Sequence, residues 1–241
     1  MKPVFTLVPL AIGSTHAFSL GTALAEISKL FPNNIAFKGA DAVISGLEST
    51  AGKILGYQET RSDLVNGDCG DVMLIFARGT GEPGNVGALV GPEFLDELVS
   101  ALPGKNVSMQ GIDPSSYPAT VAQYFTGGST GGADEMATYV SKAAASCTGT
   151  SIIMSGWSQG AQVVHLAASK VGTSGMSAVS AVVTFGDPDS NSTIAGIDSS
   201  KVKVICHDDD DICQFGDILG PTHFTYAKDT PAAASLVASV L

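Results

Sequence analysis

One serine in the chain stands in a local pattern that favours nucleophilic chemistry. Ser158 is the centre of the run Gly-Trp-Ser-Gln-Gly at residues 156–160, which fits G-x-S-x-G. The apolar run at residues 152–154 predicts a strand before it, and the residues from Gln159 onward predict a helix after it. On such a sharp turn a serine hydroxyl is presented openly, and bulk two positions before or after it would collide with neighbouring backbone. The pattern therefore predicts a nucleophilic serine.

Two groups are predicted to donate hydrogen bonds to an oxyanion that forms beside this serine. The N–H group of Gln159 is the first of the helix and has the positive end of the helix dipole behind it. The second donor is expected from the glycine-rich loop at residues 79–84, through its backbone and the Thr80 hydroxyl. This loop also fits G-x-G-x-x-G, but its proline prevents the immediate helix start that a dinucleotide-binding turn requires.

A serine nucleophile needs a base, and three histidines are candidates. His165 lies seven residues into the helix after Ser158, about 10 Å along its axis, so we expect a structural role. His207 is held in a short loop between two cysteines. His223 lies in a late loop, which suits the chain order of nucleophile, acid and base that accompanies this turn. We predict that His223 is the base.

The acid that orients the base is ambiguous from the residues alone. Four consecutive aspartates occupy residues 208–211, and Asp187 ends another predicted strand. A calcium loop would space its ligands at alternate positions with a glycine to turn, and this run does neither. We expect a solvated acidic turn from which one carboxylate pairs with His223, with no metal and no organic cofactor.

The elements around these residues alternate between strand and helix. Nearly continuous apolar runs predict strands at 72–77, 151–155, 178–185 and 201–206, and helical patterns cover 92–102, 133–145 and 159–171. We expect the glycine-rich stretch at 127–132 to be a loop. The alternation predicts the α/β class, with a central, mostly parallel sheet and helices on both faces.

Composition limits the function classes. The chain has 241 residues, 12 basic and 23 acidic, so its formal charge of -11 disfavours nucleic-acid binding. With 44% hydrophobic and 15% charged residues it can bury a sizeable core. No shift in composition interrupts residues 61–241, which we expect to form one catalytic domain.

The N-terminus predicts secretion. Residues 1–17 have the charged start, short apolar run and small residue of a signal peptide, and the apolar run is too short to cross a membrane. Secretion favours disulfide bonds, and we pair Cys206 with Cys213 across a short loop and Cys69 with Cys147. Asn106 begins one glycosylation pattern, and Asn191 begins another.

Residues 18–60 contain no motif, but part of this segment predicts an amphipathic helix. Its apolar residues recur at helical spacing and comprise Val43, Ile44, Leu47, Ala51, Ile54 and Leu55. Asp41, Glu48 and Lys53 are expected elsewhere on the helical wheel. The segment is interpreted first as a cleaved pro-segment, then as a packed helix, and thirdly as a lid over the Ser158 crevice.

Taken together, these motifs resemble the fungal cutinases, which are secreted serine esterases of a compact α/β-hydrolase fold. The resemblance rests on Ala-Arg-Gly-Thr-Gly-Glu-Pro-Gly-Asn at 77–85, on residues 156–160, on the two cysteines that enclose six residues, and on the late histidine. It implies that Asp210 is the acid, and it implies the same cysteine pairs. Thr80 stands where the family usually has Ser, and Trp157 where it usually has Tyr.

The resemblance implies hydrolysis of cutin and related aliphatic esters through an acyl-enzyme on Ser158. The expected partners are the insoluble polyester or small esters, with no nucleic acid and no stable membrane insertion, and the expected state is a secreted monomer. Two alternatives remain. One is an esterase of the acetylxylan type, and the other is a non-catalytic surface-binding protein on the same scaffold.

Overall fold

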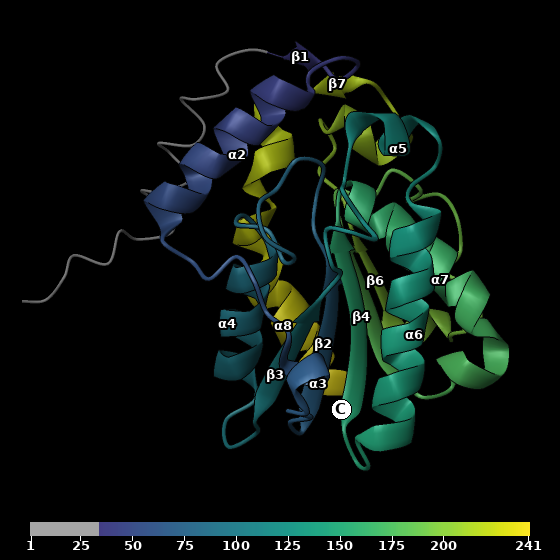
Figure 1. Cartoon of the computed structure of the whole chain (residues 1–241). Helices are drawn as coiled ribbons and strands as arrows, with labels where there is room; N and C mark the ends of the chain where they lie inside the picture. Colours follow the sequence, from purple (N-terminus) through teal and green to yellow (C-terminus); the bar gives the residue numbers. More distant parts are fainter. Residues whose placement is uncertain (1–33) are drawn as a thin grey trace, which may run out of the picture.

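The computed structural model describes residues 34–241 and is organised around a five-stranded parallel sheet (Figure 1). The strand order is β3-β2-β4-β5-β6, and every neighbouring pair is parallel. The strands are β2 Val72–Ala77, β3 Val107–Gly111, β4 Ser151–Trp157, β5 Val179–Phe185 and β6 Val202–Ile205. The predicted α/β class with a parallel sheet is confirmed.

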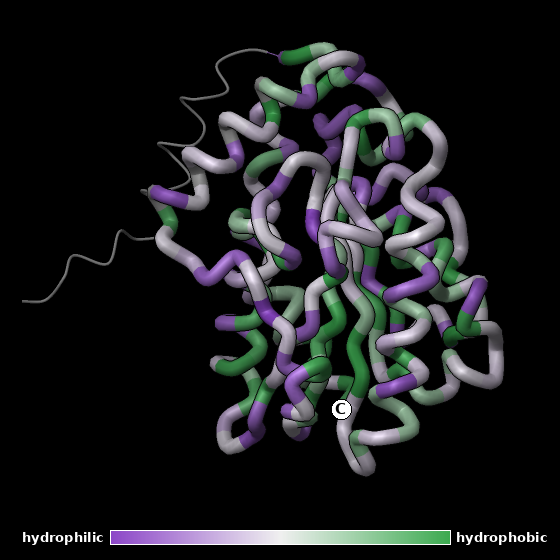
Figure 2. The backbone as a smooth tube through the Cα atoms, in the orientation of Figure 1, coloured by the Kyte–Doolittle hydropathy of each residue, from purple (hydrophilic) through white to green (hydrophobic). Residues whose placement is uncertain are grey.

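Helices cover both faces of this sheet. One face packs against α4 Gly91–Ala101 and α8 Thr230–Val240, and the other packs against α6 Thr130–Ser146 and α7 Gln159–Met176. Successive side chains of β2 enter opposite cores, because side chains alternate along a strand. All six residues of β2 are buried, and Figure 2 shows hydrophobic colour along the strands between more polar outer helices.

Of the elements outside this sheet, β1, β7, α2 and α5 lie at the end of the sheet where β4 leads into α7 (Figure 1). A two-stranded antiparallel sheet pairs β1 Ile35–Ala36 with β7 Ile218–Leu219. The remaining elements are α2 Asp41–Leu55, α3 Asp63–Asn66, α5 Val121–Phe125 and the 3-10 helices Ser199–Lys201, Asp211–Gln214 and Pro221–Asp229. The N-terminal segment therefore returns to the C-terminal part of the chain through β1.

Two helix boundaries differ from the sequence prediction for local reasons. α6 begins inside the stretch expected to be a loop, because the Ser129 hydroxyl accepts a hydrogen bond from the Gly132 N–H group at 3.1 Å and caps the helix. α7 continues to Met176 after a kink at Gly172, whose φ of 71° leaves the helical region.

Two disulfide bonds join the cysteines in the predicted pairs, Cys69 with Cys147 and Cys206 with Cys213. The first connects the segment before β2 to the end of α6, and the second closes the loop that carries the acidic run. Asn106 is exposed on the surface. Within residues 34–241, none of the helices has the length and apolar character needed to cross a membrane.

Candidate active site

Ser158 occupies the sharp turn between β4 and α7. Its φ of 57° and ψ of -126° are unusual for a residue with a side chain, as expected for a strained turn of this kind. A Cβ atom at Gly156 would lie 2.3 Å from the carbonyl oxygen of Gly160, and one at Gly160 would lie 2.0 Å from that of Ala77. Both glycines are therefore required by the close approach of backbone on either side of the serine.

Three predicted site residues form a continuous hydrogen-bonded chain. The Nε2 atom of His223 lies 2.9 Å from Ser158 Oγ, and its Nδ1 atom lies 2.8 Å from Asp210 Oδ2. His223 belongs to the 3-10 helix Pro221–Asp229, and Asp210 precedes the 3-10 helix Asp211–Gln214. All three side chains are buried. This geometry can pass a proton from the serine hydroxyl to an imidazole held by a carboxylate.

The Asp210 carboxylate is also held by groups that sequence reasoning did not identify. The Tyr226 hydroxyl donates to its Oδ2 atom at 2.7 Å, and the Ile212 N–H group donates to Oδ1 at 3.2 Å. Burial by itself would raise the pKa of Asp210. The electrostatic interaction and hydrogen bond with His223, together with the hydrogen bonds from Tyr226 and Ile212, outweigh it and hold that pKa below its usual range. The carboxylate is therefore kept ionised.

The neighbours of Asp210 lie in a different environment. Asp208, Asp209 and Asp211 are exposed, whereas Asp210 is 3% exposed. Asp209 accepts a hydrogen bond from the Thr222 hydroxyl at 2.9 Å. The acidic run thus has one buried member and three members at the surface.

The other candidate acid and the other candidate bases form ion pairs away from Ser158. Asp187 is fully buried, and its Oδ2 atom lies 3.0 Å from His165 Nε2. Burial lowers the pKa of His165, but the hydrogen bond and charge of Asp187 raise it above the usual value. His207 Nε2 lies 2.8 Å from Asp229 Oδ2. These pairs fasten secondary-structure elements and contain no atom of Ser158.

Trp157 packs directly against the His223 ring. The two ring centroids are 5.3 Å apart and the planes are tilted by 27°. A Cβ atom at Gly79 would lie 2.4 Å from the indole ring, so the loop before Thr80 can approach only because that residue is glycine. The indole therefore supports both the imidazole and the glycine-rich loop.

The predicted oxyanion donors lie at this site and are available. Thr80 is buried, and within residues 34–241 its Oγ1 atom has no hydrogen-bond partner. Gln159 is the first residue of α7, where an N–H group has no acceptor inside the helix. Its side chain is anchored separately, since Nε2 donates to the carbonyl oxygen of Thr120 at 2.6 Å. A carbonyl oxygen placed between these two donors would be polarised by both.

A small cavity beside Ser158 is closed by the N-terminal segment. Its volume is about 10 Å³, which is about the room of one water molecule. Phe37, Ile44 and Glu48 line it from this segment, and all three are buried. The rest of the lining is Thr80, Trp157, Ser158, Leu219, His223 and Phe224. In this arrangement α2 covers the serine.

Glu48, which was predicted to lie off the apolar stripe of its helix, is buried in the structure. It is 1% exposed, and within the described residues its Oε2 atom has no hydrogen-bond partner. Burial first, and then the charge of Glu82, raise the pKa of Glu48 well above its usual value, which Arg78 only partly offsets. Glu48 follows Ile44 by four residues and so lies at the edge of the apolar stripe of α2. No sequence signal shows that this part of the helix meets the glycine-rich loop.

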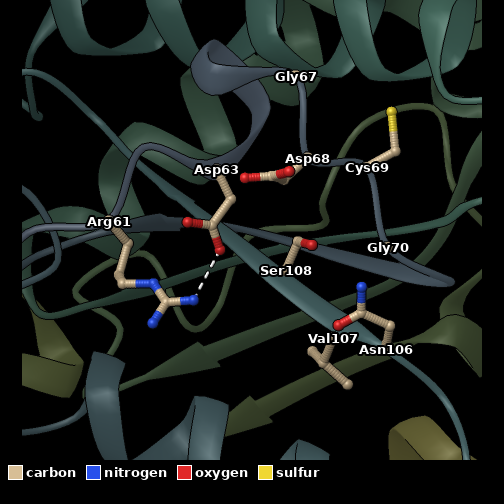
Figure 3. Close-up of a pocket in the computed structure, with 9 residues that line it drawn as sticks. All are labelled: Arg61, Asp63, Gly67, Asp68, Cys69, Gly70, Asn106, Val107 and Ser108. Carbon is tan, nitrogen blue, oxygen red and sulfur yellow. Dashed lines mark hydrogen bonds and ion pairs between the residues drawn. The ribbon is translucent and has the colours of Figure 1, made fainter.

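A larger hollow of about 360 Å³ lies elsewhere on the surface (Figure 3). Arg61 and Asp63 form an ion pair beside it at 2.7 Å. Its other lining residues are Gly67, Asp68, Cys69, Gly70, Asn106, Val107 and Ser108. None of them lines the cavity at Ser158. The part of the chain that the structure describes also lacks any group of three side chains suited to hold a metal ion.

Comparison with known proteins gives consistent results. The family model named Cutinase matches residues 68–241. A cutinase of Hypocrea jecorina is 42% identical over 219 residues, which cover 91% of this chain and 85% of that protein. A cutinase of Botryotinia fuckeliana is 44% identical over 169 residues, which cover 70% and 82%. The match to the first relative thus extends well into the N-terminal segment.

Solved structures agree with the sequence comparison. The structure of Trichoderma reesei cutinase in complex with a phosphonate inhibitor superposes with a TM-score of 0.77 at 42% identity, covering 85% of this chain and 90% of that one. An acetylxylan esterase superposes with a TM-score of 0.54 at 22% identity, covering 71% and 99%, and so shares the fold.

The fold and the site define a carboxylic ester hydrolase built on an α/β-hydrolase-like sheet. The extent of the family match makes the assignment specific. The chain belongs to the cutinase family.

Proposed function

We propose that Ser158, His223 and Asp210 hydrolyse carboxylic esters through an acyl-enzyme. His223 takes the proton of Ser158 as its Oγ atom attacks the ester carbonyl carbon, and Asp210 stabilises the resulting imidazolium. The tetrahedral oxyanion accepts hydrogen bonds from Thr80 and from the Gln159 N–H group. The imidazolium then protonates the leaving alcohol, and a water molecule releases the acid by the same steps in reverse roles. The observation that carries this proposal is the chain of two hydrogen bonds that ends at Ser158.

The proposed substrates are cutin and related aliphatic esters. Relatives that are 42% identical over most of the chain are named cutinases, and several side chains of the cavity are apolar. Of the lining residues outside the N-terminal segment, Leu219 and Phe224 are apolar and suit an acyl chain better than a sugar. Release of fatty acids from polyester film, compared with release of acetate from xylan, tests this choice. A protein that only binds a surface would not need the complete hydrogen-bonded chain.

We further propose that the protein is secreted and acts as a monomer. The two disulfide bonds suit an oxidising compartment. The predicted signal peptide, residues 1–17, lies outside the described residues. Intact-mass measurement of protein from the culture medium locates the mature start, and light scattering gives the number of chains. A mature start near residue 18 would exclude the cleaved pro-segment.

The segment that carries α2 is proposed to regulate access as a cover. Phe37 and Ile44 are buried against the cavity. The Phe37 N–H group donates to the backbone carbonyl oxygen of Asp217 at 2.7 Å, and Asp41 Oδ1 accepts from the Val121 N–H group at 2.9 Å. A retained cover predicts that deletion of residues 18–58 raises the rate on soluble short esters. Unchanged rates with a lower melting temperature would indicate a helix that only packs. Of residues 18–33, which the pro-segment hypothesis also includes, the structure gives no description.

The test of the proposed nucleophile is Ser158→Ala. Its kcat should fall on the order of 10⁶-fold, as when other triad enzymes lose the nucleophile, while the fold is retained. Covalent labelling by an organophosphonate should disappear in the same variant. Substantial esterase activity in the pure variant, or labelling that persists, would assign the nucleophile elsewhere.

A further inference from the structure

The loop that carries Thr80 contains a buried carboxylate that no step of the mechanism uses. Glu82 is 4% exposed. Its Oε2 atom accepts from the Gly79 N–H group at 2.8 Å, and its Oε1 atom accepts from the N–H groups of Ala88 at 2.9 Å and Leu89 at 3.0 Å. Three backbone donors around one side chain form an anion-binding nest within the loop itself. The carboxylate therefore ties residue 79 to residues 88 and 89.

The backbone of this loop is also fastened from outside. Arg78 donates through Nε to the carbonyl oxygen of Glu82 at 2.8 Å and through a terminal nitrogen to that of Tyr117 at 2.9 Å. The Tyr117 hydroxyl donates to the carbonyl oxygen of Arg78 at 2.9 Å. Burial raises the pKa of Glu82 above its usual value, and the three N–H groups and the charge of Arg78 offset this only in part.

Thr80 is held on both sides while its hydroxyl stays free. The Gly79 N–H group before it is bound by Glu82, and the Gly81 N–H group after it donates to the carbonyl oxygen of Ala119 at 2.8 Å. Gly87 has to be a glycine for the Glu82 carboxylate to fit, because a Cβ atom at Gly87 would lie 2.1 Å from Glu82 Oε2. The backbone of Thr80 is therefore fixed, while its hydroxyl group remains free to donate a hydrogen bond.

We propose that Glu82 is a positioning residue that holds Thr80 in place as an oxyanion donor before the substrate arrives. This inference rests on the proposed function of Thr80. A donor that is already oriented needs no rearrangement when charge develops in the transition state, and such preorganisation accounts for much of the effect of an oxyanion hole. Loosening it should lower kcat and leave KM almost unchanged, since the ground-state carbonyl depends little on the donor.

The proposal is tested with Glu82→Gln and Thr80→Val in a double-mutant cycle on kcat. In Glu82→Gln an amide NH₂ group faces backbone donors, so the loop relaxes, and kcat should fall about 10- to 10²-fold, as for a small misplacement of a catalytic group. Thr80→Val should cost about 10²- to 10³-fold. In the Thr80→Val background, Glu82→Gln should add little, because the donor that it positions is already absent.

Asp187→Asn is the matched control for the cycle. Asp187 is also a buried carboxylate that accepts hydrogen bonds, but it lies in the pair with His165. Any loss of kcat that it causes should combine independently with Thr80→Val. If Glu82→Gln fails to fold, Glu82→Asp retains the charge but is too short to reach all three N–H groups, and the same cycle applies.

The outcomes separate this inference from the proposed function. Full additivity of Glu82→Gln with Thr80→Val, or a rise in KM at constant kcat, would reduce Glu82 to a structural residue and leave the role of Thr80 intact. If Thr80→Val alone is as fast as the parent, the proposed oxyanion role fails and the positioning role fails with it.

Discussion

Asp210 differs from its three acidic neighbours in burial and in the donors that surround it. The hydrogen bonds from His223, Tyr226 and Ile212 all favour the charged carboxylate. A neutral amide at this position cannot hold the imidazole in the same tautomer. Asp210→Asn should therefore lower kcat by about 10⁴-fold, as in a comparable triad. Steady-state kinetics with a soluble ester measures the effect.

The neighbouring aspartates provide the controls for this prediction. Asp208→Asn and Asp209→Asn change exposed side chains and should leave kcat within a few-fold of the parent. Asp187→Asn should mainly lower the melting temperature, because it breaks the pair with His165. A larger loss of kcat in any of these variants than in Asp210→Asn would assign the acid elsewhere.

How far the sequence predicts the site depends on whether a residue carries local information. Ser158 has a motif between a strand and a helix, and His223 follows from chain order, so both could be proposed from the residues alone. The acid could not, because four identical neighbours differ only in which one the Cys206–Cys213 loop turns inward, and the choice of Asp210 required a family resemblance. Glu82 and Tyr226 had no signal, since their importance comes from backbone and side chains brought together by folding.

At the scale of elements, the prediction succeeded where a strand is apolar throughout and failed where burial is polar. β2 and β4 were found because both faces of the sheet are covered. β3 was missed because Ser108 and Gln110 alternate with apolar residues, and yet both are buried. Gln110 Oε1 accepts from the Val65 N–H group at 3.1 Å, so α3 provides a hydrogen-bond donor for this buried side chain of the edge strand.

Burial of a polar residue was also missed in α2. Here the buried carboxyl group of Glu48 makes closure of the cover depend on pH. In the closed arrangement Glu48 interacts electrostatically with Glu82 of the glycine-rich loop and with Arg78 just before that loop, and it lines the same cavity as His223. Its pKa is raised there, whereas an open cover would return it to its ordinary value. The closed state therefore binds a proton more tightly. Closure costs nothing below the ordinary pKa of a glutamate and becomes less favourable as the pH rises above it.

Rising pH should therefore open the cover. Trp157 is the single tryptophan of the chain and lines the same cavity, so its fluorescence reports contact with water. We expect a shift in emission as the pH rises above about 4.3, the usual pKa of glutamate, and we expect Glu48→Gln to abolish it. Glu59→Gln, which changes a half-buried acid just beyond α2, is the control and should keep the shift. An identical titration in parent and Glu48→Gln would exclude Glu48 as the titrating group.

At the scale of the whole molecule, the two disulfide bonds should contribute in different ways. Cys69 and Cys147 are 78 residues apart, and Cys206 and Cys213 are 7 apart. In the chain-entropy description the long loop stabilises the fold by about 4 kcal/mol and the short one by about 2 kcal/mol. The short loop, however, carries Asp210.

Replacing each cysteine pair by serines separates these contributions. Loss of Cys69–Cys147 should lower the melting temperature more and leave kcat at moderate temperature nearly unchanged. Loss of Cys206–Cys213 should lower kcat more than loss of the other disulfide does, because Asp210 loses its restraint. It should lower the melting temperature less than loss of Cys69–Cys147 does. Thermal unfolding and kinetics on the same samples measure both, and equal effects on kcat would contradict the proposed division.

The pairing of β1 with β7 joins the N-terminal segment to the C-terminal part of the chain. β7 lies in the chain between Asp210 and His223, and its hydrogen-bonding partner is the start of the segment that covers the serine. Removing that segment would do more than uncover the cavity. It would leave Ile218 and Leu219 as an unpaired strand edge beside the entrance, and such an edge is a template for another extended backbone. A truncated form would therefore gain access to substrate together with a tendency to self-associate at the mouth of its own active site.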